Sequence, residues 1–106
     1  MPRQLLIYLD KALAGTLTQI SPREYEFAYD KEYCSEGNMP ISPTMPLTTE
    51  VYRSSYLFPF FANLLPEGAN RRTICRHLHI DERDYFSLLA SFSGKDFIGN
   101  ISVVAP

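Results

Sequence analysis

Apolar and polar positions along the first third of the chain follow the two-residue period that is typical of β-strands. The first segment is apolar at successive positions and therefore on both faces: Leu5, Leu6, Ile7, Tyr8 and Leu9. A strand with two apolar faces is expected inside a sheet and covered on both sides. The pattern therefore predicts an interior strand at 5–9.

Two more strands follow this first one. Asp10 and Lys11 form a polar break that predicts a tight turn into a second strand, roughly Ala12 to Ile20. A third strand is predicted by three aromatic positions that alternate with acidic ones: Tyr25, Phe27 and Tyr29. Three successive strands joined by short turns predict an antiparallel meander over 5–30.

The segment from Cys34 to Thr49 breaks this regularity. It contains Gly37, Asn38 and three of the chain's eight prolines, at Pro40, Pro43 and Pro46. Proline removes a backbone donor, so it is excluded from helix interiors and from central strands. We expect a long, mostly irregular crossing here.

The second half of the chain changes to helical spacing. Pro59 suits the first turn of a helix, and Pro66 is expected to end it. The apolar positions between these prolines are Phe60, Phe61, Leu64 and Leu65. A second helix is predicted at about Asn70 to His79, with one apolar side formed by Ile74, Cys75 and Leu78.

A third helix and a final strand complete the predicted order. Asp81 is the expected N-cap, Asp84 completes a capping box, and Ile80 is expected to pack on Tyr85. The apolar stripe of this helix is Tyr85, Leu88, Leu89 and Phe92, and Gly94 is placed to end it. Residues 97–104 form a strand that returns to the sheet. The prediction is a single α+β domain over 1–106, with a small antiparallel sheet and about three short helices.

Composition fits one small globular domain and excludes several classes of protein. The chain has 106 residues, 45% of them apolar and 21% charged, with a net charge of −2. It lacks a run of about 20 apolar residues that a membrane helix requires, so a cytoplasmic protein is expected. Cys34 and Cys75 are far apart in sequence and are expected to be reduced. Between Glu67 and Asp84 the charges of four arginines are balanced by those of four acidic residues, which argues against nucleic-acid binding.

The residue spacings that enzymes use are missing or weak. Cys75, His77 and His79 are the only plausible metal ligands, but on a helix His77 points away from the other two. The five glycines are scattered and form no phosphate-binding loop. We therefore predict no catalytic residue, no cofactor site and no metal site.

The segment Phe58–Arg71 allows two interpretations. Its apolar side chains cover most of a short helix's circumference, so they either fill the core or form part of an exposed docking surface. Glu67 and Arg71, four residues apart, could simply pair with each other.

Several runs of residues resemble the N-terminal subdomain of HipA-type Ser/Thr kinase toxins. The run Leu64-Leu-Pro-Glu-Gly68 with Arg71 is similar to a box of that family, as is the preceding Phe60-Phe-Ala-Asn63. The opening Leu6–Leu17 resembles the family's first hairpin, and Asp84–Leu89 its Asp-x-Phe-x-Leu-Leu run. Lys95 departs from the family pattern, which has a glycine there. The likeness covers nearly the whole chain.

This resemblance implies a function that depends on protein contact. The family's catalytic Asp, metal-binding Asp, ATP-binding Lys and phosphate loop lie in later domains, so we expect no kinase activity here. In three-gene relatives a free-standing copy of this subdomain, HipS, is the antitoxin of a shortened kinase, HipT, beside a helix-turn-helix HipB-like DNA-binding protein. The predicted kinase-binding residues are Phe58, Phe61, Asn63, Leu65, Pro66, Glu67 and Arg71. An aspartate at position 61 or 65 is predicted to abolish rescue from the toxin.

Other functions fit the same residues. The chain could be an accessory or assembly subunit of a DNA-binding toxin–antitoxin repressor complex, without inhibitory activity of its own. It could also be a fragment of a longer kinase.

Overall fold

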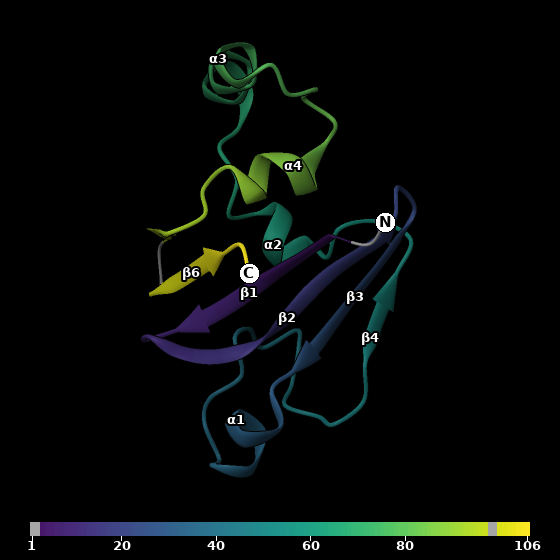
Figure 1. The fold of residues 1–106 in the computed structure, drawn as a ribbon, viewed down its shortest axis with the longest axis vertical. Helices are drawn as coiled ribbons and strands as arrows, with labels where there is room; N and C mark the ends of the chain where they lie inside the picture. Colours follow the sequence, from purple (N-terminus) through teal and green to yellow (C-terminus); the bar gives the residue numbers. More distant parts are fainter. Residues whose placement is uncertain (1–2, 98–99) are drawn as a thin grey trace.

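The computed structural model describes residues 3–97 and 100–106 of the chain. The elements follow the order β1-β2-β3-α1-β4-α2-α3-α4-β5-β6, in which strands and helices are largely segregated, so the domain is α+β, as predicted (Figure 1). The strands are β1 Arg3–Leu9, β2 Ala12–Ser21, β3 Glu24–Tyr29, β4 Tyr52–Ser54, β5 Lys95–Asp96 and β6 Ile101–Val104. The helices are α1 Lys31–Ser35, α2 Pro59–Ala62, α3 Gly68–Leu78 and α4 Tyr85–Ala90.

The strands form one antiparallel sheet of six strands in the order β4-β3-β2-β1-β6-β5, as far as the chain is described. The meander and its closure by β6 were predicted correctly. Asp10 and Lys11 take φ angles of 51° and 70°, the left-handed conformation that a two-residue hairpin turn needs. Since β1 pairs with both β2 and β6, it is the interior strand that its apolar pattern predicted.

The register of β1 and β2 shifts between Ile7 and Tyr8, beside Gly15. A Cβ atom at Gly15 would overlap the carbonyl oxygen of Ala28 and lie 2.8 Å from the Phe27 ring. The close approach of β3 therefore requires glycine at this position.

The core lies between one face of the sheet and the helices that follow β4. The inward side chains of the sheet include Leu5, Ile7, Leu17, Phe27, Ile101 and Val103. They meet four fully buried helix residues: Phe61 of α2 and Phe86, Leu88 and Leu89 of α4. The rings of Phe27 and Phe61 lie 5.6 Å apart, which joins α2 to the centre of the sheet. In Figure 1, α3 and α1 lie at opposite ends of the long axis, with the sheet between them.

The opposite face of β1 differs from its prediction. Leu6 and Tyr8 point away from the core because side chains alternate along a strand, and both are half-buried. Neither belongs to the buried core or to the partly buried residues packed against it. The prediction that β1 is covered on both sides is therefore wrong for the described chain, which covers one face.

The crossing at 36–51 is irregular, as predicted, but it is flanked by two short elements that the sequence pattern missed. The helix α1 begins at the N-cap Asp30, whose carboxylate accepts a hydrogen bond from the backbone N–H of Tyr33. The strand β4 pairs with the edge of β3 over three residues. Elements of this length contain too few residues for a hydrophobic period to be recognised.

A buried tyrosine hydroxyl holds the crossing against the sheet. The Tyr29 hydroxyl accepts a hydrogen bond from the backbone N–H of Ile41, 3.1 Å away, and donates one to the carbonyl of Met45. Its ring stacks on Tyr33 at 6.1 Å. Burial raises the pKa of Tyr29 to about 12.

Replacing Tyr29 with phenylalanine is expected to destabilise the fold by about 1–3 kcal/mol, because two buried backbone groups lose their partner. The wild-type chain should also lose stability as the pH rises from about 10 to about 12, since the unfolded tyrosine ionises first. The variant should lack this part of the alkaline slope. Urea unfolding at pH 7 and across the alkaline range checks both effects, with the exposed Tyr56→Phe as control. Equal stability of Tyr29→Phe and wild type at pH 7 would contradict the assigned hydrogen bonds.

Two helix boundaries differ from prediction. The helix α2 ends at Ala62, well before Pro66, because the N–H groups of Leu64 and Leu65 bond to carbonyls three residues earlier and tighten the chain into a turn. The helix α4 is capped by Asp84, whose carboxylate accepts the N–H of Ser87 at 3.2 Å. Asp81 was the wrong N-cap: its carboxylate accepts the N–H of Arg83 at 2.8 Å and shapes the turn before the helix.

The C-terminal strand is shorter than the predicted 97–104. It begins at Ile101, and the two-residue strand β5 pairs back onto it. Residues 98–99 of the prediction lie outside the described residues.

Candidate partner-binding site

The predicted partner-binding residues lie on α2, on the turn after it and on the first turn of α3. Three of them are core residues, with exposed fractions of 8% for Phe58, 0% for Phe61 and 4% for Leu65. All three belong to the buried core, where the Phe61 ring lies 5.6 Å from Phe27 of the sheet and 6.3 Å from Phe58. A partner cannot touch these side chains while the fold is intact.

The other predicted residues are accessible. Asn63 and Glu67 are exposed, and Pro66 and Arg71 are half-buried. We call the surface formed by Phe60, Asn63, Leu64, Pro66 and Glu67 the turn surface. The sequence pattern did not separate Phe60 and Leu64, which are half-buried and accessible, from their buried neighbours Phe61 and Leu65.

Arg71 fixes the conformation of the turn. Its Nε donates a hydrogen bond to the carbonyl of Pro66 at 2.8 Å, and one terminal N–H group donates to the Tyr85 hydroxyl at 3.4 Å. The guanidinium also lies 4.9 Å from the centre of the Tyr85 ring. Arg71 is therefore a structural residue that joins the turn to α4.

Glu67 does not pair with Arg71, one of the arrangements that the sequence allowed. No salt bridge or side-chain hydrogen bond of Glu67 occurs within residues 3–97 and 100–106. The next residue, Gly68, has a φ of 58°, a conformation that favours glycine and starts α3 directly after the turn. The turn surface thus presents a free carboxylate beside apolar side chains.

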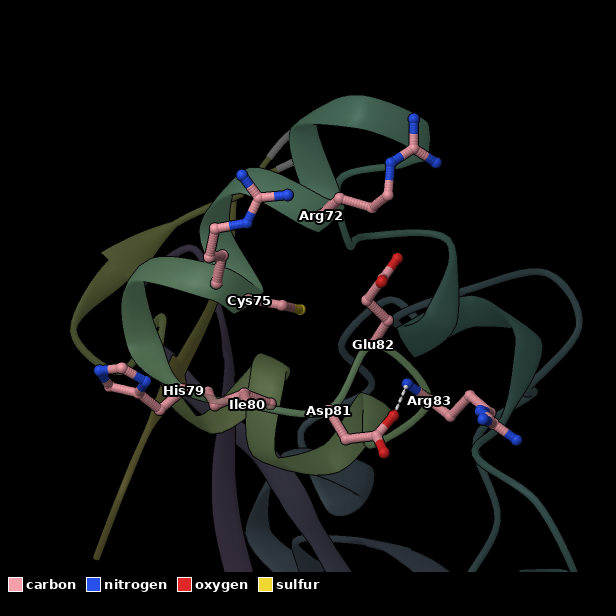
Figure 2. Close-up of a pocket in the computed structure, with 8 residues that line it drawn as sticks. Arg72, Cys75, His79, Ile80, Asp81, Glu82 and Arg83 are labelled. Carbon is pink, nitrogen blue, oxygen red and sulfur yellow. Dashed lines mark hydrogen bonds between the residues drawn. The ribbon is translucent and has the colours of Figure 1, made fainter.

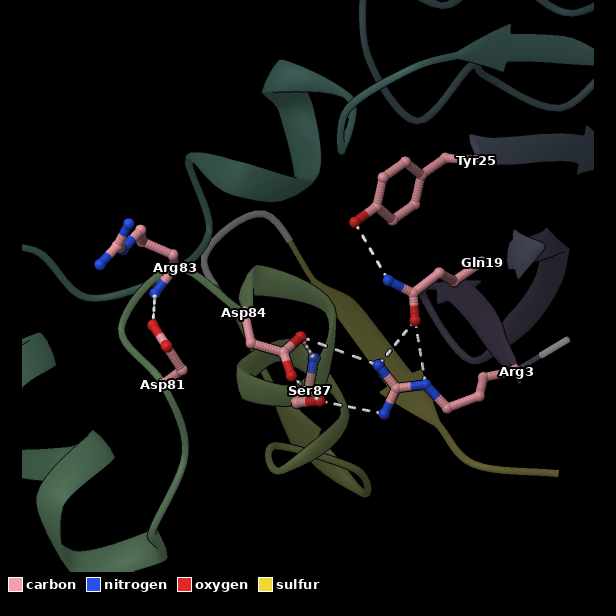
Figure 3. Close-up of polar contacts among 7 residues, drawn as sticks. All are labelled: Arg3, Gln19, Tyr25, Asp81, Arg83, Asp84 and Ser87. Atoms are coloured by element: carbon pink, nitrogen blue, oxygen red, sulfur yellow. Dashed lines mark hydrogen bonds and ion pairs between the residues drawn. The ribbon is translucent and has the colours of Figure 1, made fainter. Parts of the chain in front are cut away.

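Arg3 of β1 joins the start of α4 to the sheet (Figure 3). Arg3 donates two hydrogen bonds to the side-chain oxygen of Gln19, at 3.0 and 2.7 Å, and one to the Ser87 hydroxyl at 3.0 Å. Its guanidinium lies 4.8 Å from the Phe86 ring centre and 3.8 Å from an Asp84 oxygen. The start of α4 is thereby held on the sheet, which positions Tyr85, Arg71 and the turn.

A hollow of about 540 Å³ lies beside α3, between this helix and the 80–83 turn (Figure 2). Figure 2 shows Arg72 on α3 and Glu82 on the opposite wall, with the Cys75 thiol between the walls. Among the described residues no salt bridge joins the two walls. The arginine and carboxylate side chains are spread around the hollow and do not converge on one point, so they form no catalytic arrangement.

The one candidate metal set from the sequence is dispersed by the structure. Cys75 and His79 both line the hollow, whereas His77 lines a separate groove of about 280 Å³ on the other side of α3. His79 ends the helix in the left-handed conformation, with a φ of 56°. Within 3–97 and 100–106, no three His, Cys, Asp or Glu side chains lie close enough to hold a metal ion.

No helix in the described part of the chain has the length and apolar character needed to cross a membrane.

The groups with raised pKa values are structural: burial raises the pKa of Tyr29 and of Tyr33, and both hydroxyls donate to backbone carbonyls of the crossing.

Comparisons with known proteins place this architecture in a family. A model of the HipA N-terminal domain matches residues 5–104. A solved structure, the N-terminal domain of HipA toxin, is 29% identical and superposes with a TM-score of 0.74, covering 98% of this chain and 92% of that one.

Two relatives differ in how much of their length the match covers. A Haemophilus influenzae protein named "Uncharacterized protein" is 32% identical over 81 residues, which are 76% of this chain and 73% of that protein. A Sinorhizobium fredii protein named "Putative kinase Y4mE" is 29% identical over 93 residues, which are 87% of this chain but 22% of that protein. The chain thus spans about a fifth of this second relative, and the match in both the family model and the solved structure is to an N-terminal domain.

Proposed function

This chain belongs to the HipA N-terminal domain family, and we propose that it acts as an antitoxin of the HipS type. Its target would be a HipA-like Ser/Thr kinase of the HipT type that lacks this domain. We further propose that the complex assembles in the cytoplasm and includes a helix-turn-helix, HipB-like DNA-binding protein. In this proposal the chain itself is not an enzyme and binds no cofactor.

The observation that carries the proposal is the accessible side of the segment from α2 to the start of α3. Phe60 and Leu64 are half-buried apolar side chains, and Asn63 and Glu67 beside them are exposed and free to form polar contacts. Apolar anchors with a polar rim are the usual composition of a protein–protein interface. The same segment is held rigidly by Arg71 and Tyr85, so little conformational entropy would be lost on binding.

Inhibition requires more than binding. A chain that binds two conformations of a kinase equally well does not change their populations, so it must favour an inactive arrangement or obstruct the cleft. Moving a kinase from 1:99 to 99:1 in favour of the inactive form needs a difference in affinity of about 10⁴-fold. A turn whose backbone is held by Arg71 can supply such discrimination, because a rigid surface fits fewer arrangements of the partner's side chains than a flexible one.

The proposal is tested by co-expression with a HipA-like kinase that lacks this domain, with and without a HipB-like protein. We expect growth arrest by the kinase alone, growth rescue by this chain, and co-purification of the two proteins. Co-purification without rescue would favour a non-inhibitory assembly subunit. Growth arrest without either rescue or co-purification would overturn the proposal.

A further inference from the structure

The outward face of the sheet is apolar where four neighbouring strands lie side by side. Leu6 of β1 lies opposite Thr16 of β2 and Val104 of β6, and Thr16 lies opposite Ala28 of β3. In the next row Tyr8 lies opposite Leu13 and Ser102. We call this surface the outer sheet face; it consists of Leu6, Tyr8, Leu13, Thr16, Ala28, Ser102 and Val104.

These side chains do not belong to the core. All seven are half-buried, and none is among the core residues or the partly buried residues packed against the core. Their partial burial therefore comes from their neighbours in the sheet. On β1, β2, β3 and β6 the two rows contain no charged residue, although the solvated face of an antiparallel sheet normally carries polar side chains. The second row ends at the sheet edge with Asp96 of β5, which lies opposite Ser102. The sequence of β1 predicts packing against both faces of the strand, and the described chain packs against one face.

A polar row borders the outer sheet face on one side. Gln4 lies opposite Thr18, Thr18 lies opposite Glu26, and Glu26 lies opposite Arg53 of the edge strand β4. The Glu26 carboxylate forms a salt bridge with the Arg53 guanidinium, with 3.0 Å between the carboxylate oxygen and Nε. An apolar centre beside a polar border is the composition of a contact surface.

We propose that the outer sheet face is a second docking surface, and that it is covered by an apolar surface of the kinase. This inference rests on the proposed function. It is supported by the Sinorhizobium fredii relative, in which the region matching 87% of this chain makes up 22% of a much longer protein. The remainder of such a chain is available to cover the face in a fused kinase, and a separate kinase would cover it in the same way.

A second copy of this chain fits the face less well, because the apolar area is small. Four strands at a spacing of about 4.8 Å and rows about 7 Å apart give a patch roughly 15 Å on a side. Its area of about 200 Å² is far below the ~800 Å² that each partner buries in a stable complex. The outer sheet face therefore suits one part of a larger interface better than self-association.

The outer sheet face and the turn surface lie on opposite sides of the sheet. Variants in one surface therefore test its contribution to kinase binding without changing the other. Leu6→Lys is expected to weaken binding to the domain-less kinase at least tenfold, because it places a charge in the middle of the apolar rows. Met39→Lys is the matched control, since Met39 is an exposed apolar side chain on the crossing. Binding is measured by isothermal titration with the full chain, after circular dichroism confirms the fold of each variant.

If Leu6→Lys fails to fold, the pair Leu6→Thr and Val104→Thr decides the matter, because threonine keeps the strand preference while removing apolar surface. We expect this pair also to weaken binding, by several-fold. Wild-type affinity in a folded variant would overturn the second surface and leave the proposed function standing. A concentration-dependent wild-type dimer that Leu6→Lys dissociates would assign the face to a second copy and overturn the kinase as its occupant. No binding by the wild-type chain would overturn the proposed function and this inference together.

Discussion

Replacing Glu67 with arginine is expected to abolish growth rescue and to weaken binding to the kinase by about 100-fold. Glu67 is exposed and free of side-chain partners among the described residues. In Glu67→Arg, a kinase group that binds the carboxylate would instead contact a positive charge. Juxtaposed like charges at an interface cost several kcal/mol. The change should alter the free energy of unfolding by at most about 1 kcal/mol, through the dipole of α3.

The matched control for this variant is Glu50→Arg. Glu50 is also an exposed glutamate, and it lies on the irregular crossing, away from α2 and α3. Both variants make the same change in net charge, so general electrostatic steering affects them equally. Growth assays and titration calorimetry should separate them clearly. Equal rescue by Glu67→Arg and Glu50→Arg would remove Glu67 from the interface.

Replacing Phe61 with alanine is expected to destabilise the chain by about 3–5 kcal/mol. Phe61 is fully buried, and its ring lies 5.6 Å from Phe27 and 6.3 Å from Phe58, so its loss leaves a cavity at the centre of the core. Small domains have total stabilities of only about 5–15 kcal/mol, so this loss removes a large fraction of the stability and should weaken rescue by raising the unfolded fraction. Urea unfolding measures the effect.

The control for Phe61→Ala is Met39→Ala, because Met39 is 76% exposed and its truncation leaves no cavity. A Phe61→Ala variant as stable as Met39→Ala would contradict the burial of the ring. The same burial changes the meaning of an aspartate at position 61 or 65. Such variants are expected to lose rescue through unfolding, and so they cannot test docking.

The strands of the sheet and the helix α3 could be predicted because their signals are local. The alternation of aromatic and acidic positions defines β3, and the polar pair Asp10–Lys11 locates the hairpin turn. The short elements α1 and β4 could not be predicted, because they depend on the N-cap of Asp30 and on pairing with the edge of β3.

Competing choices between neighbouring residues were decided by tertiary packing. Asp81 and Asp84 are both good N-caps in the sequence, but α4 starts after Asp84, where Phe86 and Leu89 reach the core. Phe60 and Phe61 are identical in type and adjacent, and only contact with Phe27 identifies Phe61 as the buried one. The segment that carries the candidate site was therefore predictable, whereas its accessible side was not.

For the outward side of β1 the sequence predicts a packing contact that the described residues do not supply. Leu6 and Tyr8 predict a cover that the described residues do not provide. A partner can supply the missing cover, and in our proposal that partner is the kinase.

Inhibition of the kinase is the central claim, and one measurement tests it most directly. The purified chain is titrated into a HipA-like kinase lacking this domain while kinase autophosphorylation is followed with labelled ATP. We predict that phosphorylation falls as the chain is added and stops falling at the molar ratio of chain to kinase in the complex. The Glu67→Arg variant should need a much higher concentration for the same inhibition. Unchanged kinase activity at a large excess of the folded chain would contradict it.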